Sequence, residues 1–222
     1  KWLYGRGFSK KKKSRIINNA INVDKFAFNN EIREKLRLQH SISPKTNVLI
    51  NVGRLDYGKN HTFLLEIFKE YLSINPDSVL IIAGDGPLRS IIEEEARCLE
   101  IDDKVIFLGM IDNVAQYLSA SDIMLFPSES EGLSVVLIES QTNGLEVIVS
   151  KEGIAQETDI TGTLQFLGLD EAPSIWAKAI SDDKPIDRYK SINVVRAAGY
   201  DIKISAKELQ GLYLGLKRGN KF

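Results

Sequence analysis

Short, almost uninterrupted apolar runs alternate along the chain with stretches whose apolar residues recur every three or four positions. The runs are rich in Val, Ile and Leu, which is typical of strands buried on both faces of a parallel sheet. They predict strands at 16–18, 48–52, 79–83, 105–108, 123–126, 147–149 and 164–167. The periodic stretches predict helices at 61–72, 88–99, 114–118, 134–143, 174–180, 192–198 and 205–216.

This alternation of strands and helices predicts an α/β fold with a doubly wound, Rossmann-like parallel sheet. Two helix boundaries have a local cause: Pro87 suits the first turn of one helix, and Gly144 suits the end of another. Ligands of such folds bind outside the carboxyl ends of the strands. The loops that follow the strands are therefore the places where a site is expected.

Composition narrows the class of protein. The 222 residues are 43% hydrophobic and 27% charged, as in a soluble globular protein, and the net charge of −1 gives nucleic-acid binding no support. With no apolar run of membrane-spanning length, we expect a cytoplasmic protein. Cys98 is the single cysteine and cannot form an intrachain disulfide; its helical position predicts a buried structural thiol.

Two glutamates, Glu131 and Glu139, follow the strand predicted at 123–126. Glu131 is expected in the loop above the sheet edge, and Glu139 about a turn and a half inside the next helix. Between them, the amides of Gly132, Leu133 and Ser134 are expected at the helix start, where the dipole favours an anion. Carboxylates and free amides in one crevice suit a sugar joined to a nucleotide diphosphate.

The loop after the strand at 48–52 contains Gly53, Arg54, Gly58 and Lys59. It nearly matches a P-loop, but Asn60 stands where that motif needs a hydroxyl for magnesium. The G-x-G-x-x-G pattern of nicotinamide-dependent dehydrogenases is absent. We instead expect the two cations at the crevice mouth, opposite Glu131 two strands along, where they stabilise a diphosphate leaving group. The sequence shows no Asp-x-Asp pair or His/Asp cluster, so we expect no metal and no other cofactor.

Taken together, these residues resemble the carboxy-terminal, donor-binding half of family 4 glycosyltransferases, which have the two-domain GT-B fold. The resemblance runs from Ile17 to about Glu157, through six ordered motifs. They are 17–26, 52–59, 82–88, 105–109, 120–128 and 131–139. The sequence of residues 133–141 is most similar to that of family members that build exopolysaccharide or capsule.

The resemblance implies a retaining, metal-independent transfer of a sugar from a nucleotide-diphosphate donor. Arg54 and Lys59 would hold the diphosphate, and Glu131 with the amides after it would meet the sugar. Glu139 would accept hydrogen bonds from the ribose, while Gly109 and Met110 would border the base. Glu146 stands where the family usually has a proline, and we interpret it as a solvated residue at the start of a strand.

The resemblance also implies that the amino-terminal half supplies the acceptor contacts, and a two-domain enzyme needs about twice this length. We therefore expect a linker at 1–15, a nucleotide-sugar-binding domain at 16–200 and a helix at 201–222 that docks on the missing half. The acceptor would be a glycan or a lipid-linked sugar. The basic run at 10–15 is interpreted as an exposed linker, with peripheral contact at the inner face of a membrane left open.

Two other functions remain open on the same scaffold: a binding module without catalysis, and a sugar-nucleotide epimerase. The presence of Arg54, Lys59, Glu131 and Glu139 together favours the transferase. His61 is interpreted as a solvated residue near a helix cap. Trp176 and Ile180 are expected in the core because of their helical spacing.

Overall fold

The computed structural model describes residues 17–132, 134–181 and 187–217, and the predicted linker at 1–15 lies outside them. Its centre is a six-stranded parallel sheet in the order β3-β2-β1-β4-β5-β6. The strands are β1 (Asn47–Val52), β2 (Ser78–Ala83), β3 (Val105–Gly109), β4 (Ile123–Phe126), β5 (Glu146–Ser150) and β6 (Leu164–Leu167). The α/β, doubly wound prediction is thus confirmed. The prediction of a strand at 16–18 is wrong for the two of these residues that the structure describes, since Ile17 and Asn18 belong to no strand.

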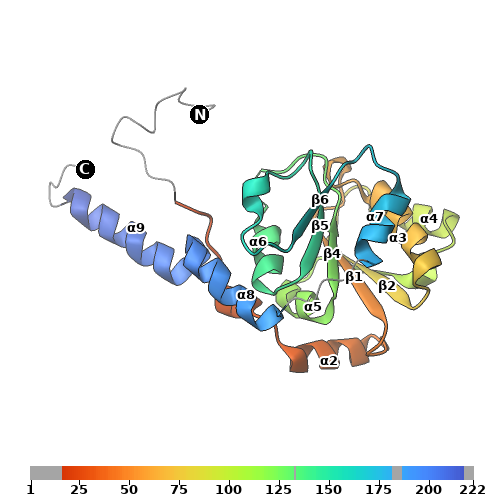
Figure 1. Cartoon of the computed structure of the whole chain (residues 1–222), viewed down its shortest axis with the longest axis horizontal. Coiled ribbons are helices and arrows are strands. Elements are labelled where there is room, and N and C mark those ends of the chain that lie inside the picture. The colour runs from red at the N-terminus through yellow and green to blue at the C-terminus, as the bar shows by residue number, and fades with distance from the viewer. Residues whose placement is uncertain (1–16, 133, 182–186, 218–222) are drawn as a thin grey trace.

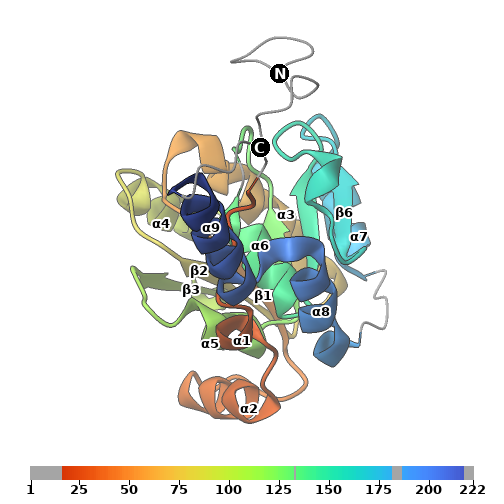
Figure 2. The same cartoon turned by 90° about the vertical axis from the view of Figure 1, so that its left-hand side faces the viewer.

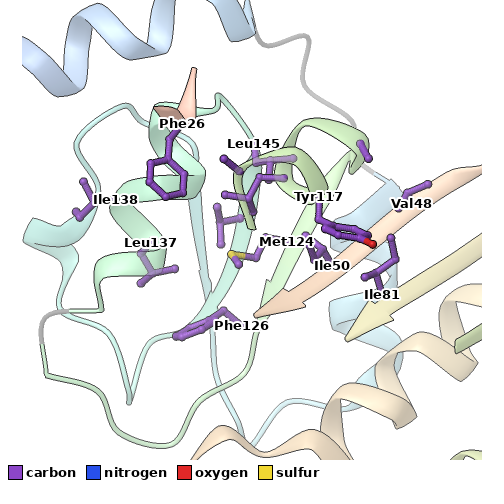
Figure 3. Close-up of a cluster of buried hydrophobic side chains, with 14 of the residues drawn as sticks. Phe26, Val48, Ile50, Ile81, Tyr117, Met124, Phe126, Leu137, Ile138 and Leu145 are labelled. Atoms are coloured by element: carbon purple, nitrogen blue, oxygen red, sulfur yellow. The ribbon is translucent and has the colours of Figure 1, made fainter. Parts of the chain in front are cut away.

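Both faces of the sheet are buried, which explains why its strands read as continuous apolar runs. Successive side chains of a strand point to opposite faces. In β1, Val48 and Ile50 pack in one core cluster and Leu49 packs in the other, all fully buried. Figure 3 shows the first cluster, in which Phe26 and Leu137 cover the face that carries Val48 and Ile50.

Helices cover the two faces of the sheet. Figure 1 shows α5 and α6 on one side and α3, α4 and α7 on the other. Their bounds are α3 (His61–Ile74), α4 (Arg89–Cys98), α5 (Val114–Ala120), α6 (Val135–Thr142) and α7 (Pro173–Ser181). Because α4 begins at Arg89, Pro87 precedes the helix instead of occupying its first turn. Gly144 ends the α6 segment as predicted, with a φ of +72° that favours glycine.

Two helices were not predicted: α1 (Val23–Phe26) and α2 (Asn30–Gln39). The inner side of α2 combines the buried apolar residue Leu36 with two arginines, Arg33 and Arg37. They bind Asp122 at 2.5 and 2.6 Å, and the side chain of Arg37 is only 4% exposed. Asp122 also accepts a bond from the amide of Val48 at 2.7 Å. An ionic contact therefore attaches α2 to the sheet, where apolar periodicity gives no signal.

The end of the described chain projects from the domain. After α8 (Arg188–Val195), a π-helical turn (Arg196–Tyr200) leads into α9 (Ile202–Lys217), and Figures 1 and 2 show α9 extending away from the sheet. Its base is anchored by the backbone of Ile21, which donates to Tyr200 O and accepts from Ile202 N, both at 2.9 Å. The helix predicted at 192–198 is thus a continuation of α8 into the π-helical turn, and the helix predicted at 205–216 lies within α9.

Burial confirms the core predictions for Trp176 and Ile180 and corrects those for Cys98 and Glu146. Trp176 is 0% exposed and Ile180 2% exposed, and Trp176 Nε1 donates to Gly168 O at 3.0 Å. Cys98 is exposed, so the prediction of a buried thiol is wrong. Helix α4 buries Ile92 and Ala96, and Cys98 lies about 200° around the helix from Ala96. Glu146 is buried at the start of β5, so its interpretation as a solvated residue is also wrong.

Candidate functional site

The strand order reverses between β1 and β4, which is the point where doubly wound sheets bind ligands. The two strands are direct neighbours, paired through Leu49 with Ile123 and Ile50 with Met124. The prediction that Lys59 and Glu131 lie two strands apart is therefore wrong. Their loops are adjacent and joined by a bond from the amide of Glu129 to Gly58 O at 2.9 Å.

Lys59 and Glu131 form an ion pair across this switch point. Lys59 belongs to the 3-10 turn Tyr57–Lys59 after β1, and Glu131 to the loop after β4. Their side chains are 21% and 11% exposed, and Lys59 Nζ also lies 5.4 Å from the ring centroid of Phe126. The amide of Glu131 donates to Gly153 O at 3.1 Å, which supports the loop from the β5 side. Two predicted catalytic residues are thus brought together in a partly buried position.

Arg54, the second predicted cation, is exposed and lines a cavity of about 670 Å³ at the carboxyl ends of β1, β2 and β3. Nothing in the described part of the chain forms an ion pair with it. Gly53 and Met110 line the same cavity, and Met110 is 86% exposed. Gly109 ends β3 directly before Met110, with a φ of +67°. The cavity therefore joins the predicted diphosphate and base regions.

The glycine-rich segment after β2 supports the loop that carries Arg54. A Cβ atom added to Gly86 would lie 2.3 Å from Leu55 O, so only glycine allows this contact. Backbone bonds run from Leu55 N to Asp85 O and from Leu88 N to Leu55 O, both at 3.1 Å. Close packing of two loops is thus a physical reason for these glycines.

Glu139 lies just over one turn inside α6 and is half-buried. Burial raises the pKa of its carboxyl, and the nearby cation Lys25 opposes this shift. No hydrogen bond or ion pair joins Glu139 to Lys59 or Glu131 within the described residues. Lys25 lies on helix α1, which the sequence did not predict, so its position near Glu139 was not predicted either.

At the amino end of α6, Ser134 occupies the N-cap position without a side-chain cap bond, and Gly132 is exposed. Leu133 lies outside the described residues. The amino end of α6 therefore follows directly on the loop that carries Glu131. The prediction that these amides bind an anion remains a prediction.

His61 opens α3 beside Lys59 but is only 3% exposed, so its interpretation as solvated is wrong. Neither ring nitrogen has a hydrogen-bond partner in the described part of the chain. Burial lowers the pKa of His61 to about 4; Asp56 opposes this shift and Lys59 adds to it. Its burial had no signal in the sequence, because the residue stands between a loop and the first turn of a helix.

A second cavity of about 510 Å³ lies at the opposite, amino edge of the sheet. It is bordered by Arg33, Asp122 and Arg188. These groups are already bound: Arg33 to Asp122, and Arg188 to the carbonyls of Leu118 and Ser121 at 3.0 and 2.8 Å. Because these three charged groups are engaged in holding helices to the sheet, we place the functional site at the carboxyl edge.

Among the described residues, no three His, Cys, Asp or Glu side chains gather closely enough to hold a metal ion. Metal independence itself stays a prediction. None of the helices in the described ranges is both long and apolar enough to cross a membrane.

The sheet order and its flanking helices define the Rossmann-like fold found in GT-B glycosyltransferase structures. The solved structure of HepE from Anabaena, in complex with UDP, has this fold. Its TM-score is 0.71 at 18% identity, over 90% of this chain and 57% of HepE. Residues 32–182 match the profile of the family "Glycosyl transferases group 1", and the chain belongs to this family.

Two curated relatives agree with this assignment. EpsF of Bacillus subtilis, named as a glycosyltransferase, is 30% identical over 217 residues, which are 96% of this chain and 56% of EpsF. The capsular polysaccharide biosynthesis glycosyltransferase CapH of Staphylococcus aureus is 31% identical over 182 residues, 80% of this chain and 50% of CapH. These two similarities confirm the resemblance to exopolysaccharide and capsule enzymes. The chain spans about half the length of these relatives.

Proposed function

We propose that this chain is the donor-binding part of a retaining glycosyltransferase. The enzyme transfers a hexose-type sugar from a nucleotide-diphosphate donor to a glycan or lipid-linked acceptor. The observation that carries the proposal is the Lys59–Glu131 pair at the switch point, beside the cavity lined by Arg54 and Met110. A cation for phosphate and a carboxylate for sugar hydroxyls meet where an α/β sheet binds its ligand.

The diphosphate is assigned to Arg54 and Lys59. Arg54 is exposed and has no ionic partner among the described residues, so its guanidinium is available to a phosphate. As the bond to the sugar breaks, negative charge grows on the leaving diphosphate, and fixed cations stabilise it. In this proposal two side-chain cations take the place of a metal ion, and no cofactor takes part.

The sugar is assigned to Glu131 and to the amides of Gly132, Leu133 and Ser134 at the start of α6. Glu139 is assigned to the ribose hydroxyls, because a half-buried carboxylate accepts hydrogen bonds strongly. Gly109 and Met110 are assigned to the base, since Met110 is an exposed apolar residue at the cavity. HepE, which shares the fold, was solved with UDP, and this supports a nucleotide-linked donor.

The acceptor is assigned to the part of the enzyme outside this chain. The relatives EpsF and CapH are about twice as long, and CapH is named for capsular polysaccharide biosynthesis. We propose a glycan or lipid-linked acceptor, a cytoplasmic enzyme that can lie at the inner face of a membrane, and docking of α9 on the remaining half. Ile204 and Tyr213 of α9 are 42% and 62% exposed, which supports an interface there. We also propose that the nucleotide-sugar-binding domain ends at residue 200 and that the docking helix follows it.

The test is a screen of the longer protein against a panel of nucleotide sugars, with glycan and lipid-linked acceptors. Transfer with retained anomeric configuration is the expected result. Binding without transfer or hydrolysis would favour the binding module, and epimerised donor would favour the epimerase. The 222-residue chain in the same assay is expected to transfer no sugar, because the acceptor side of the cleft is lacking.

A further inference from the structure

We propose that the Lys59–Glu131 pair is a self-inhibitory contact that discriminates the intact sugar donor from the nucleoside diphosphate product. The inference rests on the proposed function, because both residues are assigned there to parts of the donor. Each residue is paired with the other through the charged group that is assigned to the donor. A ligand must therefore separate them before either can act.

The pair is held in place by more than its own charges. The bond from the Glu129 amide to Gly58 O fixes the spacing of the two loops. Lys59 lies over the Phe126 ring, and a Cβ atom added to Gly53 would lie 3.6 Å from the aliphatic stem of Lys59. Since this backbone bond ties the two loops together, Lys59 and Glu131 face each other across the switch point.

Separating the pair has an unequal cost for the two ligands. A diphosphate that takes Lys59 leaves Glu131, whose side chain is 11% exposed, without its counter-charge. A carboxylate this far from water needs hydrogen bonds to replace the lost partner. The hydroxyls of a donor sugar supply them, whereas the only sugar hydroxyls of a nucleoside diphosphate are those of its ribose, which is assigned to Glu139.

The Lys59–Glu131 pair therefore favours binding of the donor and release of the product. The intact donor replaces both halves of the pair, so binding it is favoured. After transfer the product lacks the sugar, and Glu131 competes with the diphosphate for Lys59. The returning ion pair thereby assists product release.

The test is calorimetry of the 222-residue chain with UDP, and with GDP and ADP in parallel, in wild type and Glu131→Gln. Glutamine keeps the size of the side chain but removes its charge. We expect Glu131→Gln to bind the nucleoside diphosphate about threefold to tenfold more tightly. The gain should vanish in a Lys59→Ala background, because Lys59 is the group that is released. Glu131→Ala serves as a second neutral variant if the glutamine alters folding.

Glu129→Gln is the matched control, since Glu129 is an exposed glutamate two residues away in the same loop. It should change the affinity less than about twofold. Equal tightening by Glu129→Gln, or no tightening by Glu131→Gln, overturns the inference while wild-type binding still supports the proposed function. Absence of binding by wild type and every variant overturns both.

Discussion

The backbones of Gly84 and Gly53 touch so closely that a Cβ atom on Gly84 would lie 1.8 Å from the Gly53 carbonyl oxygen. Gly84 also has a φ of +145°, which side-chain-bearing residues rarely adopt. The contact joins the loop after β2 to the loop that presents Arg54. The position of the proposed phosphate cation thus depends on a glycine thirty residues further along the chain.

We predict that Gly84→Ala lowers the free energy of unfolding by about 2–4 kcal/mol. The substitution forces the two loops apart and adds backbone strain. Denaturant unfolding monitored by circular dichroism measures the effect. Gly132→Ala is the control, because a Cβ there meets nothing within 4 Å, and it should stay within about 0.5 kcal/mol of wild type. Equal losses for both variants would refute the packing account.

Asp122 gives a second stability prediction. Replacing it with Asn leaves Arg33 and the buried Arg37 without a counter-charge, and such a loss costs about 3–5 kcal/mol. The exposed pair Arg97–Glu94 is the control: Glu94→Gln should cost less than about 0.5 kcal/mol. Urea unfolding compares the two variants. A mild effect of Asp122→Asn would show that α2 does not depend on this contact.

His61 predicts an acid sensitivity. A histidine whose pKa falls from 6.5 to about 4 on folding is neutral in the native state, and protonation favours unfolding. Its contribution of about 3 kcal/mol is fully present above pH 6.5 and is lost as the pH falls towards 4. His61→Leu should flatten stability over that window.

The sequence predicted the strands well because both faces of the sheet are buried and each strand is therefore a continuous apolar run. It failed at α2, where Leu36 is the buried apolar residue and Arg33 and Arg37 make the ionic contact with Asp122. Among the site residues, Lys59 and Glu131 were predicted one by one. Their ion pair was not, since 72 positions separate them and only the adjacency of β1 and β4 brings them together.

The proposed roles of Arg54 and Glu139 predict opposite losses of affinity. Arg54→Ala should weaken binding of the nucleoside diphosphate about tenfold to a hundredfold while leaving nucleoside binding unchanged. Glu139→Gln should weaken ribonucleotides more than their 2′,3′-dideoxy analogues. Competition binding with these ligands distinguishes the two roles. Equal losses for both ligand types in either variant would mean that the residue acts on the fold.

The central claim is that this chain binds a nucleoside diphosphate through side-chain cations without a metal. Isothermal titration calorimetry of the 222-residue chain in excess chelator, with UDP, GDP and ADP, tests it most directly. We expect measurable heat with at least one of the three and no gain in affinity when magnesium replaces the chelator. No heat with any of them, or binding that appears only with magnesium, would contradict it.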